Sequence, residues 1–185
     1  MNIETKLLHA GIEPDESTGA IMTPIYQTST YVQAKVGQNK GYEYSRTLNP
    51  TRHALEKNLA AIENGKFGLC FGSGMAAIDN LLKLLSAGDE VISTSDLYGG
   101  SYRIFTTVFQ KYGIKFNFVD MTNAQNVADA ITNKTKLIWV ETPTNPMMSI
   151  IEIEAISKIK GDAILAVDNT FATPFLQNPL DLGAD

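Results

Sequence analysis

The chain has 185 residues, of which 44% are hydrophobic and 19% are charged. This composition excludes disordered and collagen-like classes and indicates a globular protein of one domain, or two at most. The net charge of -5 has the wrong sign for neutralising a phosphate backbone, so we expect no nucleic-acid partner. No run of about eighteen apolar residues and no basic, then apolar N-terminal leader occurs. We therefore expect a cytoplasmic protein with no membrane partner.

Cysteine and histidine are too scarce for a disulfide or a metal centre. The single cysteine, Cys70, lies in the apolar run 67–71 and is predicted to be a buried, unreactive thiol. The two histidines, His9 and His53, cannot form a metal site without carboxylates. We expect no metal.

Glycine and proline punctuate the first part of the chain, which predicts an extended N-terminal arm over residues 1–48. The first clear helix is predicted to begin at Asn49-Pro50, a capping residue followed by proline at the first helical position, and to end at Asn64-Gly65. We assign residues 49–185 to an α/β domain.

Short apolar runs then alternate with helical patterns. Strands are predicted at 67–71, 90–94, 115–119, 136–141 and 163–168, and helices near 75–86, 101–112, 123–131 and 152–160. The strands are apolar without strict alternation, which is typical of strands that helices cover on both faces. The sequence therefore predicts a doubly wound, mainly parallel sheet after the extended arm.

Parallel sheets bind ligands at the carboxyl ends of their strands, and the residues that follow these strands are informative. Gly72-Ser73-Gly74-Met75 opens a helix whose first N–H groups suit a phosphate. Tyr98 lies between strand and helix beside glycines and can stack on a planar ring. Asn145 offers an amide between two prolines, and Asp168 places a carboxylate at the rim of an apolar strand, where a cation would offset its desolvation.

Each of these features also has an ordinary role as a turn, a packed aromatic or a cap. Together they match one phosphorylated aromatic cation, pyridoxal phosphate (PLP). Its phosphate suits the helix terminus, its ring Tyr98, its 3-hydroxyl Asn145, and its ring nitrogen Asp168, which keeps the ring protonated as an electron sink.

Two different kinds of site could use the same glycines. Residues 72–77 match the dinucleotide fingerprint G-x-G-x-x-A, with Asp96 downstream, but this interpretation leaves Tyr98, Asn145 and Asp168 without a role. A serine nucleophile elbow at Ser73 would need glycine where Phe71 and Met75 stand, so a hydrolase is set aside.

The chain resembles the trans-sulfuration family of PLP enzymes, and the resemblance extends from near its start to Leu182-Gly183-Ala184-Asp185. The segments that carry the resemblance are Pro24–Thr30, Tyr44-Ser45-Arg46 with Asn49–Arg52, Ser73–Ala77, Asp96–Arg103, Glu141–Pro146 and Val167–Phe171. The resemblance implies the large PLP-binding domain of an aspartate-aminotransferase-like, fold type I enzyme.

The resemblance also implies roles for single residues. Ser73, Gly74 and Met75 would bind the phosphate, Asn145 would lie by the 3-hydroxyl, Asp168 would pair with the ring nitrogen, and Tyr98 would stack on the ring and act in catalysis. Tyr44 and Arg46 would complete the phosphate site of a neighbouring subunit. A homo-oligomer, a dimer of dimers with shared active sites, follows from that role.

Two positions bear on the substrate, which is expected to be a small amino acid. Arg103 resembles the substrate-carboxylate arginine of cystathionine gamma-synthases and gamma-lyases, and Gly100 stands where methionine gamma-lyases carry cysteine. We therefore favour gamma-replacement or gamma-elimination on cystathionine or activated homoserine. Methionine gamma-lyase, cystathionine beta-lyase and O-acylhomoserine sulfhydrylase are the alternatives within the family.

This chemistry needs a lysine that forms a Schiff base with the cofactor, and no lysine of the chain is well placed for that role. In the family it lies on a Ser-x-Thr-Lys turn, which we expect just past Asp185. We therefore expect these residues to be the N-terminal portion of a longer enzyme and to be inactive alone. A non-catalytic cofactor-binding or oligomerising fragment is the alternative of another class.

Overall fold

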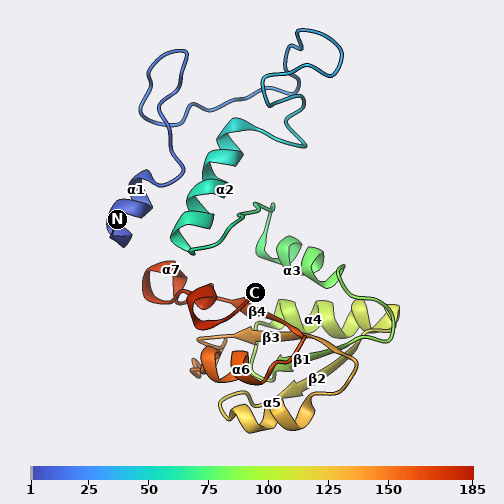
Figure 1. Ribbon diagram of the computed structural model, residues 1–185. Helices are drawn as coiled ribbons and strands as arrows, with labels where there is room; N and C mark the ends of the chain where they lie inside the picture. Colours follow the sequence, from blue (N-terminus) through green and yellow to red (C-terminus); the bar gives the residue numbers. More distant parts are fainter. Residues whose placement is uncertain (1) are drawn as a thin grey trace. The chain divides into compact units, whose positions relative to one another are not determined.

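Figure 1 shows the computed structural model, which describes residues 2–185. These residues form two compact units, one that ends at Cys70 and one over Phe71–Asp185. The first unit contains the expected arm together with the first predicted helix, and the second contains the sheet.

The predicted helix after the arm is confirmed as α2 (Pro50–Ile62). Asn49 caps it as expected, because its side-chain oxygen accepts from the N–H of Thr51 at 2.9 Å and Pro50 takes the first helical position. The amide group of Asn49 also donates to the carbonyl of Tyr26 at 2.9 Å. One polar side chain therefore starts the helix and holds part of the preceding segment to it.

The expectation of an extended arm over residues 1–48 was wrong for its first part, which forms α1 (Ile3–His9). A helix of seven residues is marginal on its own, so its stability comes from tertiary contacts. Asn58 of α2 provides one of these contacts, since its amide donates to the carbonyl of Ala10 at 2.8 Å, at the end of α1.

The second unit is built on a parallel sheet, which confirms four of the five predicted strands and the fold class. Among the described residues its strands are β1 (Glu90–Thr94), β2 (Lys115–Val119), β3 (Thr135–Glu141) and β4 (Ile164–Asp168), in the order β2-β1-β3-β4. All neighbouring pairs are parallel. The order changes direction between β1 and β3, where such sheets open a ligand crevice.

The prediction of a strand over 67–71 was wrong, because this segment forms no strand. Phe67 and Leu69 are exposed, and Gly68 packs closely on the backbone of α2 at Glu56. Cys70 is only partly buried, which corrects the expectation of a buried thiol; partial burial raises its pKa, and its N–H donates to the Glu56 carboxylate at 3.1 Å. An apolar run predicts burial, but a strand forms only where its backbone pairs with a neighbouring strand, and residues 67–71 are not paired in this way.

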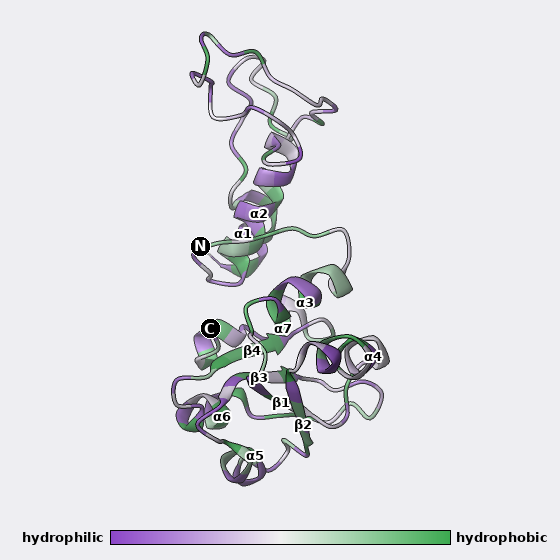
Figure 2. Cartoon of the chain, turned by 90° about the vertical axis from the view of Figure 1, so that its right-hand side faces the viewer, coloured by the Kyte–Doolittle hydropathy of each residue, from purple (hydrophilic) through white to green (hydrophobic). Residues whose placement is uncertain are grey.

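Helices cover both faces of the sheet, so the doubly wound arrangement is confirmed. One face carries α3 (Gly74–Leu82), α4 (Gly99–Thr107) and the 3-10 turn η1 (Phe109–Tyr112); the other carries α5 (Ala124–Ala130) and α6 (Ile153–Ile159). Figure 2 shows β4 as almost wholly hydrophobic, whereas α5 and α6 carry both hydrophobic and hydrophilic residues. These helices turn their apolar sides to the sheet.

Alternate residues of β3 face opposite layers. Leu137 and Trp139 pack with α3 and α4, whereas Ile138 and Val140 pack with α5 and α6. By the same alternation, the last residue of β3, Glu141, projects toward the α3 and α4 side, where the sheet opens to the candidate site.

Two short helices that the sequence did not predict follow β4: α7 (Thr173–Leu176) and the 3-10 turn η2 (Pro179–Leu182). After them, Asp185 pairs with β4, since its N–H donates to the carbonyl of Leu165 at 3.0 Å. Over the described residues, no helix has the length and apolar character that crossing a membrane requires.

Candidate active site

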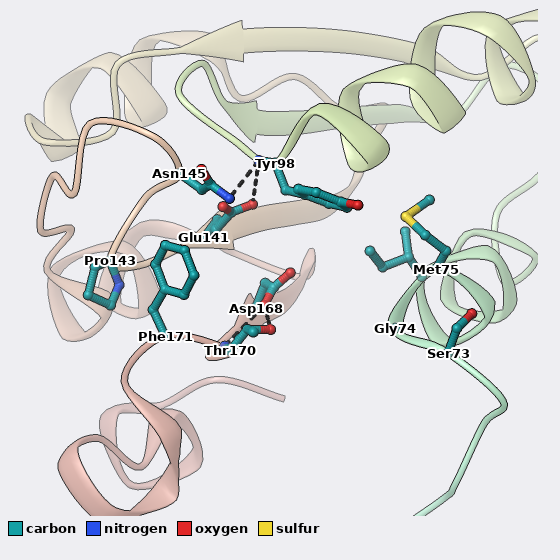
Figure 3. Close-up of a pocket in the computed structure, with 11 residues that line it drawn as sticks. Ser73, Gly74, Met75, Tyr98, Glu141, Pro143, Asn145, Asp168, Thr170 and Phe171 are labelled. Atoms are coloured by element: carbon teal, nitrogen blue, oxygen red, sulfur yellow. Dashed lines mark hydrogen bonds between the residues drawn. The ribbon is translucent and has the colours of Figure 1, made fainter.

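A cavity of about 400 Å³ lies within the second unit, beside the carboxyl ends of β1, β3 and β4 (Figure 3). It brings together the residues that the sequence placed at separate strand ends. Its lining consists of Ser73, Gly74, Met75, Ile78, Tyr98, Glu141, Pro143, Asn145, Asp168, Thr170 and Phe171. Six of these were predicted as site residues: Ser73, Gly74, Met75, Tyr98, Asn145 and Asp168.

The start of α3 forms one wall of the cavity. Ser73 caps the helix, because its hydroxyl accepts from the N–H of Ala76 at 3.1 Å. The N–H groups of Gly74 and Met75, in the first turn, have no carbonyl partner within the helix. A side chain built on Gly74 would meet no atom within 4 Å, so protein packing does not require glycine here. The open space and the free N–H groups suit an anion.

The Tyr98 ring lies beside this helix terminus. A Cβ built on Gly100 would lie 2.4 Å from a ring carbon of Tyr98 and 2.9 Å from the sulfur of Met75. Gly100 therefore lets the ring and the Met75 side chain approach its backbone. Tyr98 is nevertheless 48% exposed, which leaves a face of its ring for a ligand.

Asp168 ends β4 on the cavity side. Its Oδ1 atom accepts from both the N–H of Thr170, at 3.1 Å, and the Thr170 hydroxyl. These bonds form the turn that the sequence allowed as an ordinary role for this residue. Both use the same oxygen, so among the described residues Oδ2 remains available to a ligand. The turn orients the carboxylate through Oδ1.

Glu141 is the one titratable residue of the described cavity lining that the sequence analysis missed as a site residue. It is 5% exposed, and its two carboxylate oxygens accept from the N–H of Tyr98 at 2.9 and 3.1 Å. Burial raises its pKa to about 7; the N–H groups of Tyr98 and Asn145 oppose this shift, and the charges of Asp168 and Asp96 add to it. A signal was present, since Glu141 follows an apolar strand as directly as Asp168 follows its own.

Three predicted residues are not among those that line the cavity. Arg103 is exposed on α4. Tyr44 and Arg46 belong to the first unit, where the guanidinium carbon of Arg46 lies 5.4 Å from the centre of the Tyr44 ring. Their roles toward a substrate and a neighbouring subunit stay predictions.

The structure contradicts the dinucleotide alternative. Residues 67–71, directly before Gly72, form no strand, although that fingerprint requires one. Asp96, which would bind a ribose, instead accepts from the hydroxyl of Thr144 and the N–H of Met147. Nor do three His, Cys, Asp or Glu side chains gather as a possible metal site anywhere in residues 2–185.

Comparison with known proteins identifies the family. The model of the Cys/Met metabolism PLP-dependent enzymes matches residues 4–185. Cystathionine beta-lyase of Coxiella burnetii is 51% identical over 100% of this chain and 48% of its own length, and cystathionine gamma-lyase of Bacillus subtilis is 50% identical over 100% and 49%. A probable cystathionine gamma-synthase of Herpetosiphon aurantiacus is 50% identical over 98% and 57%.

Solved structures agree. That of metB from Corynebacterium glutamicum has a TM-score of 0.97 and 48% identity, covering 100% of this chain and 49% of the other. Cystathionine gamma-lyase from Lactobacillus plantarum, complexed with L-serine, has a TM-score of 0.96 and 49% identity over the same shares. The chain spans about half the length of the relatives it matches. On sequence and structure alike, it belongs to the Cys/Met metabolism family of PLP-dependent enzymes.

Proposed function

We propose that this chain is the cofactor-binding part of a PLP-dependent enzyme of sulfur amino acid metabolism. The observation that carries the proposal is the cavity that joins the start of α3, the Tyr98 ring, Asn145 and Asp168. The names of the relatives, which are cystathionine lyases and synthases, support the substrate class.

The charge distribution of the cavity fits PLP. Its lining among the described residues includes two carboxyl groups, Glu141 and Asp168, and no lysine, arginine or histidine. An acidic wall favours a protonated ring nitrogen, and the start of α3 favours the phosphate. A cofactor with a cation at one end and an anion at the other suits both walls.

Each residue then has a role in holding the group. The N–H groups of Gly74 and Met75 bind the phosphate, with Ser73 beside them, and the Tyr98 ring covers the pyridine ring. Asp168 holds the proton on the ring nitrogen, and Asn145 donates to the 3-hydroxyl. When bound, PLP supplies an electron sink for a carbanion of the substrate. We assign the movement of a substrate proton to the Tyr98 hydroxyl.

Two further parts of the proposal concern residues outside the cavity lining. Arg103 binds the substrate carboxylate, and a lysine encoded after Asp185 bonds the cofactor. The length of the relatives, about twice that of this chain, supports the second part. Without that lysine, residues 1–185 bind PLP without turnover, as a non-catalytic cofactor-binding fragment would.

The reaction that we favour is gamma-replacement or gamma-elimination, because Arg103 matches the gamma-enzymes. Cystathionine beta-lyase is the second candidate, since a relative of that name is 51% identical. Methionine gamma-lyase and O-acylhomoserine sulfhydrylase are the remaining candidates within the family. We further propose a cytoplasmic homo-oligomer, a dimer of dimers, in which Tyr44 and Arg46 reach the phosphate of a neighbouring subunit.

The cofactor is tested by titrating the purified protein with PLP. Trp139 is the single tryptophan and lies on β3 two residues before Glu141, so bound PLP should quench its fluorescence. A nicotinamide dinucleotide serves as the control and should not quench it. Saturable quenching of Trp139 by PLP supports the proposal, and unchanged Trp139 fluorescence with PLP contradicts it.

The reaction is tested with cystathionine and protein that includes the sequence after Asp185. Release of cysteine identifies gamma-cleavage, and release of homocysteine identifies beta-cleavage. Formation of cystathionine from cysteine and an activated homoserine identifies the synthase. No turnover despite bound PLP would support a non-catalytic, cofactor-binding role.

A further inference from the structure

Hydrogen bonds to carboxylates join two loops at the site, and each loop region supplies one carboxylate that accepts from the other. Glu141, at the end of β3, binds the main chain of Tyr98 in the loop after β1. Asp96, in the loop after β1, accepts from the Thr144 hydroxyl and, at 3.2 Å, from the N–H of Met147 in the loop after β3. Each of the two chain segments therefore receives a carboxylate from the other.

Two of the residues that make these contacts are buried, whereas Met147 is exposed. Glu141 is 5% exposed and Thr144 is 1% exposed. The Thr144 hydroxyl also accepts from the N–H of Ser149 at 2.8 Å, and the Thr144 N–H donates to the Ser149 carbonyl at 3.0 Å. The loop after β3 is thus closed on itself before Asp96 binds it. Hydrogen bonds to carboxylates away from water are the strong ones.

The loops carry two residues of the proposed cofactor site, Tyr98 and Asn145. Tyr98 needs an anchor, because it is 48% exposed and protein packs on part of it only. Asn145 lies between Thr144 and Met147, the two residues that Asp96 binds. Its N–H also lies close enough to Glu141 to lower the pKa of that carboxyl.

We propose that Glu141 and Asp96 are a pair of positioning residues that lock these loops together and so fix the Tyr98 ring relative to Asn145. The pair goes beyond the proposed function, which gives Glu141 only a place in the cavity wall and gives Asp96 no role. The proposal rests on the proposed function in one respect only, namely that Tyr98 and Asn145 are positioned for cofactor binding.

The lock is tested in the cofactor-free protein by hydrogen exchange of single amides, which reports local opening. In Glu141→Leu, exchange of the Tyr98 amide should accelerate about ten- to a hundredfold, as expected for loss of a bond to a carboxylate. In Glu141→Gln, which keeps one acceptor oxygen, the acceleration should be smaller. Asp96→Ala should act on the Met147 amide in the same way, and Asp96→Asn should restore most of the protection.

The matched controls remove carboxylates that also accept hydrogen bonds but lie away from the two loops. Glu90 begins β1 at the opposite edge of the sheet and accepts from the Thr132 hydroxyl, and Asp120 follows β2 and accepts from the N–H of Thr122. Glu90→Gln and Asp120→Asn should leave the Tyr98 and Met147 amides unchanged. Unchanged exchange of both amides in Glu141→Leu and Asp96→Ala would overturn the proposal, as would equal acceleration across all amides of β1 and β3.

A second readout connects the lock to the cofactor. Quenching of Trp139 by PLP should need at least tenfold more PLP in Glu141→Leu than in Glu90→Gln, with Glu141→Gln between them. An unchanged PLP affinity with accelerated Tyr98 exchange would overturn the positioning role and leave the contacts intact. If the unaltered protein does not bind PLP, the proposed function fails, while the exchange data still decide whether the loops are locked.

Discussion

Glu141 and Asp168 are direct partners in the register of β3 and β4, each the last residue of its strand. Side chains at paired positions of parallel strands project from the same face, so both carboxyl groups enter one cavity. The charge of Asp168 is one of the causes that raise the pKa of Glu141, after burial. The pairing therefore puts a carboxyl that holds its proton up to about neutral pH beside the proposed partner of the ring nitrogen.

The raised pKa of Glu141 predicts how stability changes with pH. Its pKa rises from 4.5 to about 7 in the folded chain, so between these values the unfolded state loses the proton first. The free energy of unfolding should fall as pH rises from 4.5 to 7, by up to about 3 kcal/mol, and this contribution should be constant above pH 7. Asp120, Glu154 and Asp185 have lowered pKa values and act with the opposite sign, below pH 4.5.

Urea unfolding followed by Trp139 fluorescence, at pH 5, 6, 7 and 8, measures this change. Glu141→Gln has no titrating group at this position and should lose the decline, whereas Glu90→Gln should keep it. The same decline in Glu141→Gln as in the unaltered chain would show that another group causes it.

Asp168→Asn separates the turn from the cofactor role. Asparagine can accept from the N–H of Thr170 as aspartate does, so folding and PLP binding should persist. Turnover should fall about 10²- to 10³-fold, because a preorganised charge beside the ring nitrogen is lost. Asp120→Asn changes the same kind of turn, at Thr122, outside the cavity and serves as the control. Turnover within about threefold of the unaltered enzyme would contradict the role of Asp168.

Two adjacent glycines offer a matched pair at the Tyr98 ring. A methyl group on Gly100 would collide with the Tyr98 ring and Met75, whereas one on Gly99 would meet no atom within 4 Å. Both positions lie in the first turn of α4, so alanine changes the backbone entropy similarly. Gly100→Ala should displace the ring and weaken PLP binding about tenfold or more, and Gly99→Ala should not. Equal affinities, measured by Trp139 quenching, would show that the ring does not contribute.

The proposed subunit sharing is tested with Arg46→Ala. This change should weaken PLP retention, because Arg46 is expected to reach the phosphate of a neighbouring subunit. Mixing it with Asp168→Ala should restore part of the activity, since a hybrid dimer contains one intact site. A monomer in size-exclusion chromatography with full PLP affinity would contradict the idea.

The sequence predicted β1 and β2 at their observed bounds and the other two strands to within a residue. The strands β1 and β3 are buried over most of their length by helices on both faces, whereas β2 is only partly buried. The apolar residues that mark each strand form a local pattern. The sequence also predicted six residues of the cavity, because the carboxyl ends of parallel strands lie at one edge of the sheet. Wherever local pattern and chain topology suffice, the prediction agrees with the structure.

The tertiary structure decided what depends on partners distant in the sequence. The run at 67–71 is as apolar as a strand, yet its residues form no strand. Glu141 follows its strand as Asp168 does, but only the fold brings the Tyr98 N–H, 43 positions away, to its buried carboxylate. Composition and periodicity show which residues are buried at a strand end; which donor meets them there is set by the crossing of the chain between β1 and β3.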